Sequence, residues 1–475
     1  MSSAEDGTAR QTWLYIPLAA RAAHLSPLTA RSLRNFLFSG SRYVARPAVS
    51  LISTPILLSY LGVSQYGIWM IVTSILGVSA IADFGVLDSI VRYVSKHHAV
   101  GDEAAIVRTI RSAVSLCAIV GLAVMAFLAV TASYVTGHVF RMAPEEQTLA
   151  ISAIRLAGPY FLFAFVNAGF RNALRGCHRY DLDAKLDVGF EVLTTLTNVV
   201  LAFSGRGLAA ILVSMTVWSL IEICVTALTL KRMVVRSMVF WPLLSRSVLG
   251  ESAGYAAFMW SQGVTAMLLA NFDRLLIGSL LGPDSLAYYA VALQLAKQVH
   301  GFLSNALAFL FPTFSEISEA GSKARLSRLY RRAFSATLVA ALLIAVPLYV
   351  LGPLILKLWL GENIASMAQV SLRILVCYFF VTTLTIIPHY FLNGIGNSRL
   401  NAIYLGAASI ASIGAALLLL PRFGAPGAAL ARLAIVPVCG ILWGVIHHRM
   451  GLGVLWTIVP TGLAALAIVT AVGSL

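Results

Sequence analysis

Long apolar runs separated by short polar segments dominate this sequence. Twelve of them are long enough, at about 20 predominantly apolar residues, to cross a lipid bilayer as a helix. They cover approximately residues 35–60, 66–91, 109–134, 148–170, 186–204, 207–230, 251–277, 285–312, 333–356, 366–392, 401–420 and 427–446, and a thirteenth run covers 453–473. Hydrophobic residues make up 59% of the 475, and a water-soluble fold could not bury that much apolar surface. We therefore predict an all-α polytopic membrane protein.

Basic residues lie between the apolar runs rather than on a polar domain, so the net charge of +15 does not indicate nucleic-acid binding. Every second loop is rich in lysine and arginine, as cytoplasmic loops of membrane proteins are. This alternation predicts a cytoplasmic N-terminus. The basic residues of these loops are Arg92, Lys96, Arg108, Arg171, Arg175, Arg179, Lys185, Lys231, Arg232, Arg236, Arg246, Lys323, Arg325, Arg328, Arg331 and Arg332.

The two halves of the chain align at a constant offset of 220 residues. Leu61-Gly62 falls on Leu281-Gly282, and Gly101 falls on Gly321. Each repeat holds six apolar runs, an even number, so both halves enter the membrane in the same direction and a pseudo-twofold axis along the membrane normal is expected. The expected division is a cytoplasmic N-terminal tail (1–33), an N-lobe (34–230), a cytoplasmic linker (231–250), a C-lobe (251–447) and an additional C-terminal membrane segment (448–475).

Ionisable residues inside the apolar runs are the candidate functional groups, because burying them in a bilayer is costly. We count more bases than acids among them, and an excess of cationic groups around a cavity favours an anionic cargo such as a phosphate. Snorkelling to headgroups or structural ion pairing is the alternative at each position. The candidate substrate-binding bases are Arg42, Arg46, Arg155, Arg274, Lys297, Arg373 and Arg432, and the acids are Asp83, Asp88, Glu222 and Asp273.

No catalytic motif is present in the sequence, so we predict that the protein is not an enzyme and has no catalytic residues, metal site or cofactor. Without an ATP-binding motif, transport would be driven by an ion gradient, the membrane potential or consumption of the cargo. Candidates for ion coupling are Asp83, Asp88, Glu222, Asp273 and His300.

Six stretches together resemble the polysaccharide-transport flippases, a family of the multidrug/oligosaccharidyl-lipid/polysaccharide exporter superfamily. They are PILLSYLGVSQYGIWMIVTSI (55–75), ADFGVLDSIVRYVSK (82–96), NFDRLLIGSLLGPDSLAYYAVALQL (271–295), FPTFSEIS (311–318), LNGIGNSRLNA (392–402) and GAPGAALARLA (424–434). The resemblance implies two six-helix lobes around a cationic cavity. It also implies translocation of undecaprenyl-pyrophosphate-linked oligosaccharide across the bacterial inner membrane by alternating access.

Two other functions remain open at this point: an ion-coupled multidrug exporter of the same fold, which an acidic cavity would favour, and a non-transporting scaffold for polysaccharide synthesis. If the protein is a flippase, its expected partners are the lipid-linked oligosaccharide, membrane lipids, a polysaccharide polymerase and glycosyltransferases. We expect a monomer and no nucleic acid.

Overall fold

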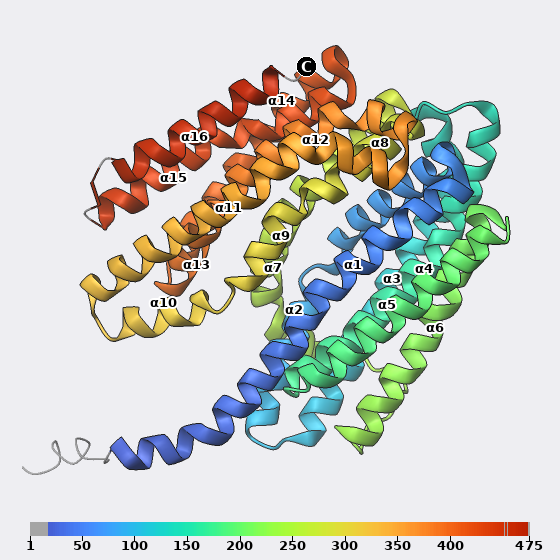
Figure 1. Ribbon diagram of the computed structural model, residues 1–475. Helices are drawn as coiled ribbons and strands as arrows, with labels where there is room; N and C mark the ends of the chain where they lie inside the picture. The colour runs from blue at the N-terminus through green and yellow to red at the C-terminus, as the bar shows by residue number, and fades with distance from the viewer. Residues whose placement is uncertain (1–17, 451, 454, 474–475) are drawn as a thin grey trace, which may run out of the picture.

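The computed structural model describes residues 18–450, 452–453 and 455–473, the side chains of residues 18–46, 80, 449, 455 and much of 246–269 excepted. Every regular element among the described residues is helical. Figure 1 shows two helical bundles, one built from the blue to green helices and one from the yellow to red helices, which diverge toward the end that carries α2 and α10.

The N-terminal bundle contains six long helical segments. Its helices are α1 (Leu18–Ser79), the short η1 (Ala80–Asp83), α2 (Val86–Ala99), α3 (Glu103–Tyr134), the short η2 (Val135–Val139), α4 (Pro144–Gly176), α5 (Tyr180–Phe203) and α6 (Gly207–Met233). The C-terminal bundle consists of α7 (Arg246–Leu281), α8 (Pro283–Ala296), α9 (Gln298–Ala306), α10 (Leu310–Glu319), α11 (Lys323–Leu360), α12 (Glu362–Thr383), α13 (Ile386–Gly394), α14 (Ser398–Arg432), η3 (Leu433–Ile435) and α15 (Val436–Arg449), and α16 (Leu455–Val472) follows it.

Equivalent glycines form the first turn of each bundle. Gly62 has φ 78° and ψ 168°, and Gly282 has φ 86° and ψ 179°, a backbone region open essentially to glycine alone. The offset of 220 residues persists beyond this turn, because α3 begins at Glu103 and α11 begins at Lys323 (103 + 220 = 323). The predicted repeat is therefore present in the structure.

Nine helices among the described residues are long and apolar enough to cross a membrane. This number is lower than the thirteen apolar runs in the sequence because some runs are joined into one helix and others form shorter helices. Two of the nine each join two expected spans across a glycine kink, at Gly62 in α1 and at Gly424 in α14. The run expected at 285–312 is divided into α8, α9 and α10, and α16 is a shorter apolar helix.

The second span of the N-terminal bundle is interrupted where the sequence predicts a continuous helix over 66–91. Phe84 (φ 48°) and Gly85 (φ 72°) adopt left-handed conformations between η1 and α2. Asp83 then caps the new helix, since its Oδ1 accepts a hydrogen bond from the Leu87 amide at 2.9 Å.

The two bundles pack closely at the end that carries Gly62 and Gly282, which we call the turn end, and α7 also contacts η1 through the hydrogen bond from Trp260 to the Ile81 carbonyl oxygen. A Cβ atom on Gly67 would lie 2.0 Å from the carbonyl oxygen of Pro283, so only glycine permits this approach of α1 to α8. Nearby, Gly278 of α7 lies against Ile71 and Phe140 of the other bundle. The turn end is therefore closed by packed backbone and apolar side chains.

The linker between the bundles, Val234–Ser245, lies along α3. Leu243 and Ser245 donate backbone hydrogen bonds to Ser115 Oγ (3.0 Å) and Ser112 Oγ (3.2 Å). Val235 and Met238 are buried in the apolar core of the N-terminal bundle. The linker is thus attached to the N-terminal bundle up to the start of α7.

The additional C-terminal helix, α16, packs against α12 and α15. His447 of α15 lies at the centre of this contact, with Nε2 3.1 Å from the Tyr330 hydroxyl and Nδ1 3.1 Å from Thr457 Oγ1. The predicted thirteenth segment is therefore an integral helix of the C-terminal side.

Candidate functional site

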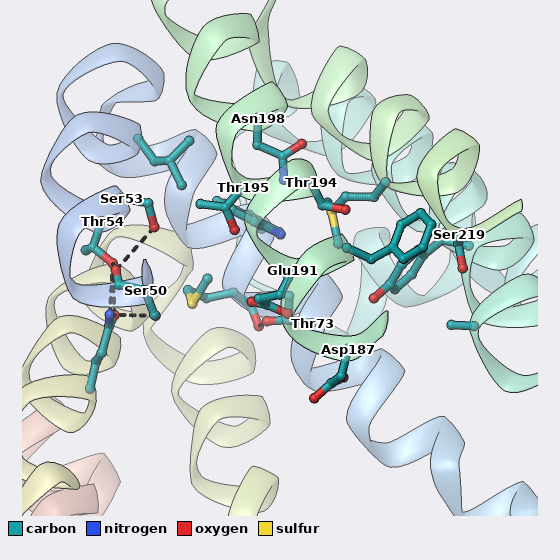
Figure 2. Close-up of a pocket in the computed structure, with 18 of the residues that line it drawn as sticks. Ser50, Ser53, Thr54, Thr73, Asp187, Glu191, Thr194, Thr195, Asn198 and Ser219 are labelled. Carbon is teal, nitrogen blue, oxygen red and sulfur yellow. Dashed lines mark hydrogen bonds between the residues drawn. The ribbon is translucent and has the colours of Figure 1, made fainter. Parts of the chain in front are cut away.

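A cavity of about 500 Å³ lies between the two bundles. One wall comes from α1, α4, α5 and α6 of the N-terminal bundle, and the other from α7, α8 and the residue that follows α8. Figure 2 shows α5 side chains, among them Glu191, Thr195 and Asn198, on one side of the space and Ser50 and Thr54 of α1 on another. The cavity is the site that the fold positions between its two halves.

Arg274 and Lys297 form the charged part of the C-terminal wall. Lys297 lies at the break between α8 and α9. Arg274 Nε is buried and has no hydrogen-bond partner. Among the described side chains, no carboxylate forms an ion pair with either residue.

The charged part of the N-terminal wall is a network centred on Arg171 of α4. Its guanidinium contacts Asp183 Oδ1 at 2.7 Å, Asp187 Oδ1 at 2.5 Å and Glu222 Oε1 at 3.7 Å. Arg175 contacts the other oxygen of Asp183 at 2.7 Å. Because Asp183 is fully buried, its charge requires this pairing, which joins α4 to α5.

Hydroxyl, amide and aromatic groups line the space between the charged walls. Gln294 of α8 hydrogen bonds with Ser50 Oγ (2.8 Å) and Thr54 Oγ1 (3.0 Å) of α1, so it joins the bundles beside the cavity (Figure 2). The Oδ1 atoms of Asn167 and Asn198 are buried without a hydrogen-bond partner. The other lining side chains of this kind include Ser53, Tyr66, Trp69, Thr73, Tyr160, Phe190, Thr194, Thr195 and Ser219.

Three of the sequence-predicted site residues line this cavity: Arg274, Lys297 and Glu222. Lys297 also lines a second, lateral pocket beside α9, which it shares with His300. The side chains of Arg42 and Arg46 lie outside the described residues.

The remaining predicted bases do not line the central cavity. Arg432 is buried against Asp273 at 2.9 Å, Arg373 lies with its guanidinium carbon 5.8 Å from the centre of the Tyr349 ring, and the exposed Arg155 donates to Ser133 Oγ at 3.2 Å. The predicted acids Asp83 and Asp88 also lie outside it: Asp83 caps α2, and Asp88 is exposed in the first turn of the same helix.

The sequence count of acids within the spans was incomplete. It omitted Asp187 and Glu191, although both fall within the run expected at 186–204, and it assigned Arg171 to a loop, whereas α4 extends to Gly176. The spacing of Asp183, Asp187 and Glu191 by four residues, which places them on one helical face, was the available signal. Among the lining residues described, three bases therefore face three acids rather than a basic excess.

A family described as "Polysaccharide biosynthesis protein" matches residues 56–369, which is most of the two bundles. The chain belongs to this family. It is also 21% identical over 431 residues to a protein of Shigella flexneri named "Putative O-antigen transporter", and the match covers 88% of this chain and 98% of that protein.

Two solved transporter structures share the fold of this chain. An inward-facing multidrug resistance MATE family transporter of the MOP superfamily matches with a TM-score of 0.68 at 14% identity. The match covers 91% of the present chain and 99% of the transporter. The lipid II flippase MurJ, in an inward closed conformation, matches with a TM-score of 0.66 at 13% identity, over 92% and 98% of the two chains. These likenesses confirm the predicted fold, a multi-pass membrane protein of two six-helix lobes, to which we now refer as the N-lobe and C-lobe.

Proposed function

We propose that this protein is a flippase that moves an undecaprenyl-pyrophosphate-linked oligosaccharide across the bacterial inner membrane by alternating access. The observation that carries the proposal is the position of Arg274 and Lys297, which present two positive charges to a cavity between the lobes without an ion-paired carboxylate among the described residues. Cationic side chains in a low-dielectric site attract a pyrophosphate strongly. Family membership and the O-antigen relative support a polysaccharide-linked cargo.

In this proposal the N-terminus is cytoplasmic, so the turn end faces the periplasm and the end carrying α2 and α10 faces the cytoplasm. The packing of Gly67 on Pro283 then closes the periplasmic side. The pyrophosphate binds Arg274 and Lys297, with Arg42 and Arg46 as further candidate partners. The sugars occupy the polar part of the cavity while the prenyl chain remains in the lipid.

A second candidate, an ion-coupled exporter of small molecules, is favoured by Asp187, Glu191 and Glu222 in the cavity. Carboxylates can bind organic cations or a coupling ion, and multidrug transporters are among the structural neighbours. For a flippase the same carboxylates would contact the glycan or couple an ion to its movement.

A deletion strain tests the two candidates against each other. As a flippase, the protein restores surface polysaccharide to that strain, whereas the Lys297→Ala and Arg274→Ala variants do not, at equal protein levels in the membrane. Arg328→Ala, which removes an exposed base of α11, is the matched control and restores it. Restoration by both cavity variants, or a change in drug susceptibility without a change in surface polysaccharide, would overturn the flippase proposal.

A further inference from the structure

A groove between α11, α12 and α16 opens on the outer side of the C-lobe. It has a volume of about 180 Å³ and a mostly apolar lining, which includes Leu342 and Val346 of α11, Phe380 of α12 and Leu466 of α16. Figure 1 shows α16 on the side of the C-lobe that is turned away from the N-lobe. Val346 and Leu466 are 54% and 57% exposed, so in a membrane this groove is open to lipid.

Arg373 of α12 lies at one end of this groove. It precedes Val376 and Cys377, two lining residues, by three and four positions, and residues at these spacings share one face of a helix. Its guanidinium carbon is 5.8 Å from the centre of the Tyr349 ring, which also lines the groove. The Tyr349 hydroxyl donates to the Thr470 carbonyl oxygen at 3.2 Å and so connects α11 to α16 at this end.

Arg373 forms no ion pair with a carboxylate among the side chains that the structure describes. Its Nε atom is buried without a hydrogen-bond acceptor. The contact with the Tyr349 ring is favourable, but a ring face does not satisfy the N–H donors of a guanidinium. An arginine among membrane helices is costly without an anion beside it, and the guanidinium fork fits two oxygens of one phosphate. This end of the groove therefore suits an anionic headgroup.

We propose that the groove binds an anionic phospholipid of the surrounding membrane. The phosphate accepts hydrogen bonds from Arg373, and one acyl chain lies along Leu342, Phe380 and Leu466. Because all three lining helices contact that lipid, it stabilises the attachment of α16 to the C-lobe. The central cavity has other walls, so this proposal does not depend on the identity of the cargo.

Native mass spectrometry of the purified full-length protein tests the proposal, because it counts the lipids that a protein retains. The protein is equilibrated with equal amounts of phosphatidylglycerol, which is anionic, and phosphatidylethanolamine, whose ammonium group offsets the charge of its phosphate. We expect one retained phosphatidylglycerol, bound about tenfold more tightly than phosphatidylethanolamine. Arg373→Gln should reduce this preference to about twofold or less.

Arg155→Gln is the matched control. Arg155 lies as far into α4 as Arg373 lies into α12 (155 − 144 = 11 and 373 − 362 = 11), but it is exposed and donates to Ser133 Oγ. This variant should keep the preference of the wild type. Leu466→Ser acts on the acyl chain instead of the headgroup, so it should weaken both phospholipids by a similar factor, about threefold.

Leu475 lies outside the described residues, so the terminal carboxylate needs a control of its own. A chain extended by a Gly-Ser tail carries that carboxylate elsewhere, and it should retain phosphatidylglycerol as the unextended chain does. Retention by the extended chain alone would overturn the proposal, because Arg373 would then have the terminal carboxylate as its partner.

Equal retention of the two phospholipids by the wild-type protein would also overturn the proposal, as would an equal loss of phosphatidylglycerol in Arg373→Gln and Arg155→Gln. Displacement of phosphatidylglycerol by an equal concentration of undecaprenyl phosphate would assign the groove to a prenyl lipid and contradict a phospholipid site. None of these results bears on the flippase proposal, which concerns the central cavity.

Discussion

Arg432 places Nε and Nη2 each 2.9 Å from the same oxygen of Asp273, Oδ2, inside the C-lobe. Both residues are only 6% exposed, and the guanidinium also lies over the Tyr378 ring. The pair joins α14 to α7 across 159 residues of sequence. Two of the candidate site residues therefore bind each other inside the C-lobe and do not line the cavity.

We expect Arg432→Met to destabilise the protein by about 3–5 kcal/mol, because it leaves the Asp273 carboxylate buried without a counter-charge. Adding Asp273→Asn to that variant removes the uncompensated charge and should recover part of the loss. Thermal unfolding of the detergent-solubilised protein measures both effects. A double variant that melts at or below the temperature of Arg432→Met would show that the pair is not coupled in this way.

Gly67→Ala should open the turn end. The added methyl group would lie 2.0 Å from the Pro283 carbonyl oxygen, so α1 and α8 must separate, at a cost of about 1–3 kcal/mol. Spin labels at the exposed positions Ser204 and Asn363, introduced into a Cys224→Ser background, report the distance between the lobes at this end.

The matched control for that experiment is Gly406→Ala in α14, where an added Cβ meets no atom within 4 Å. Its label distance should equal that of the wild type, and its stability should rise slightly, because alanine favours a helix over glycine by about 1 kcal/mol. An unchanged label distance in Gly67→Ala would contradict the assignment of Gly67 and Pro283 as the contact that closes this end.

Removal of the hydroxyls that hold the linker should expose it to protease. The double variant Ser112→Ala/Ser115→Ala removes the hydroxyl that accepts from the Ser245 amide and the hydroxyl that accepts from the Leu243 amide. Each lost hydrogen bond should raise the rate of tryptic cleavage at the exposed Arg236 about fivefold. Ser152→Ala is the control, since that hydroxyl bonds only within its own helix. Equal cleavage rates in all three proteins would mean that these two hydroxyls do not hold the linker, which α3 also contacts through Glu103 and Arg111.

Hydrophobicity alone predicts most of this fold, because a bilayer restricts spanning segments to helices of known length. The repeat located the turns at Gly62 and Gly282, since a backbone conformation open only to glycine leaves a mark in the sequence. The interruption at Phe84 and Gly85 was missed, because a break within an apolar run changes its hydropathy little.

The site was predicted less completely than the fold. Lys297 and Arg274 were identified because an ionisable group within a span is costly and unusual. One sequence does not show which acid neutralises which base, so Arg432 could not be separated from Arg274 before Asp273 was seen to bind it. Asp187 and Glu191 were available in the sequence and required a helical-face analysis of α5.

The most direct test of the account is lipid transfer by the purified protein. Liposomes that contain a fluorescent undecaprenyl-pyrophosphate oligosaccharide in both leaflets are reconstituted with the wild-type protein, Arg328→Ala or Lys297→Ala, and a membrane-impermeant quencher reports how much cargo reaches the outer leaflet. We predict that the wild type and Arg328→Ala move the cargo between leaflets and that Lys297→Ala slows this transfer at least tenfold, since a charge-assisted contact contributes roughly 1.5–3 kcal/mol. Transfer by Lys297→Ala at the wild-type rate, or no transfer by the wild-type protein, would contradict the account.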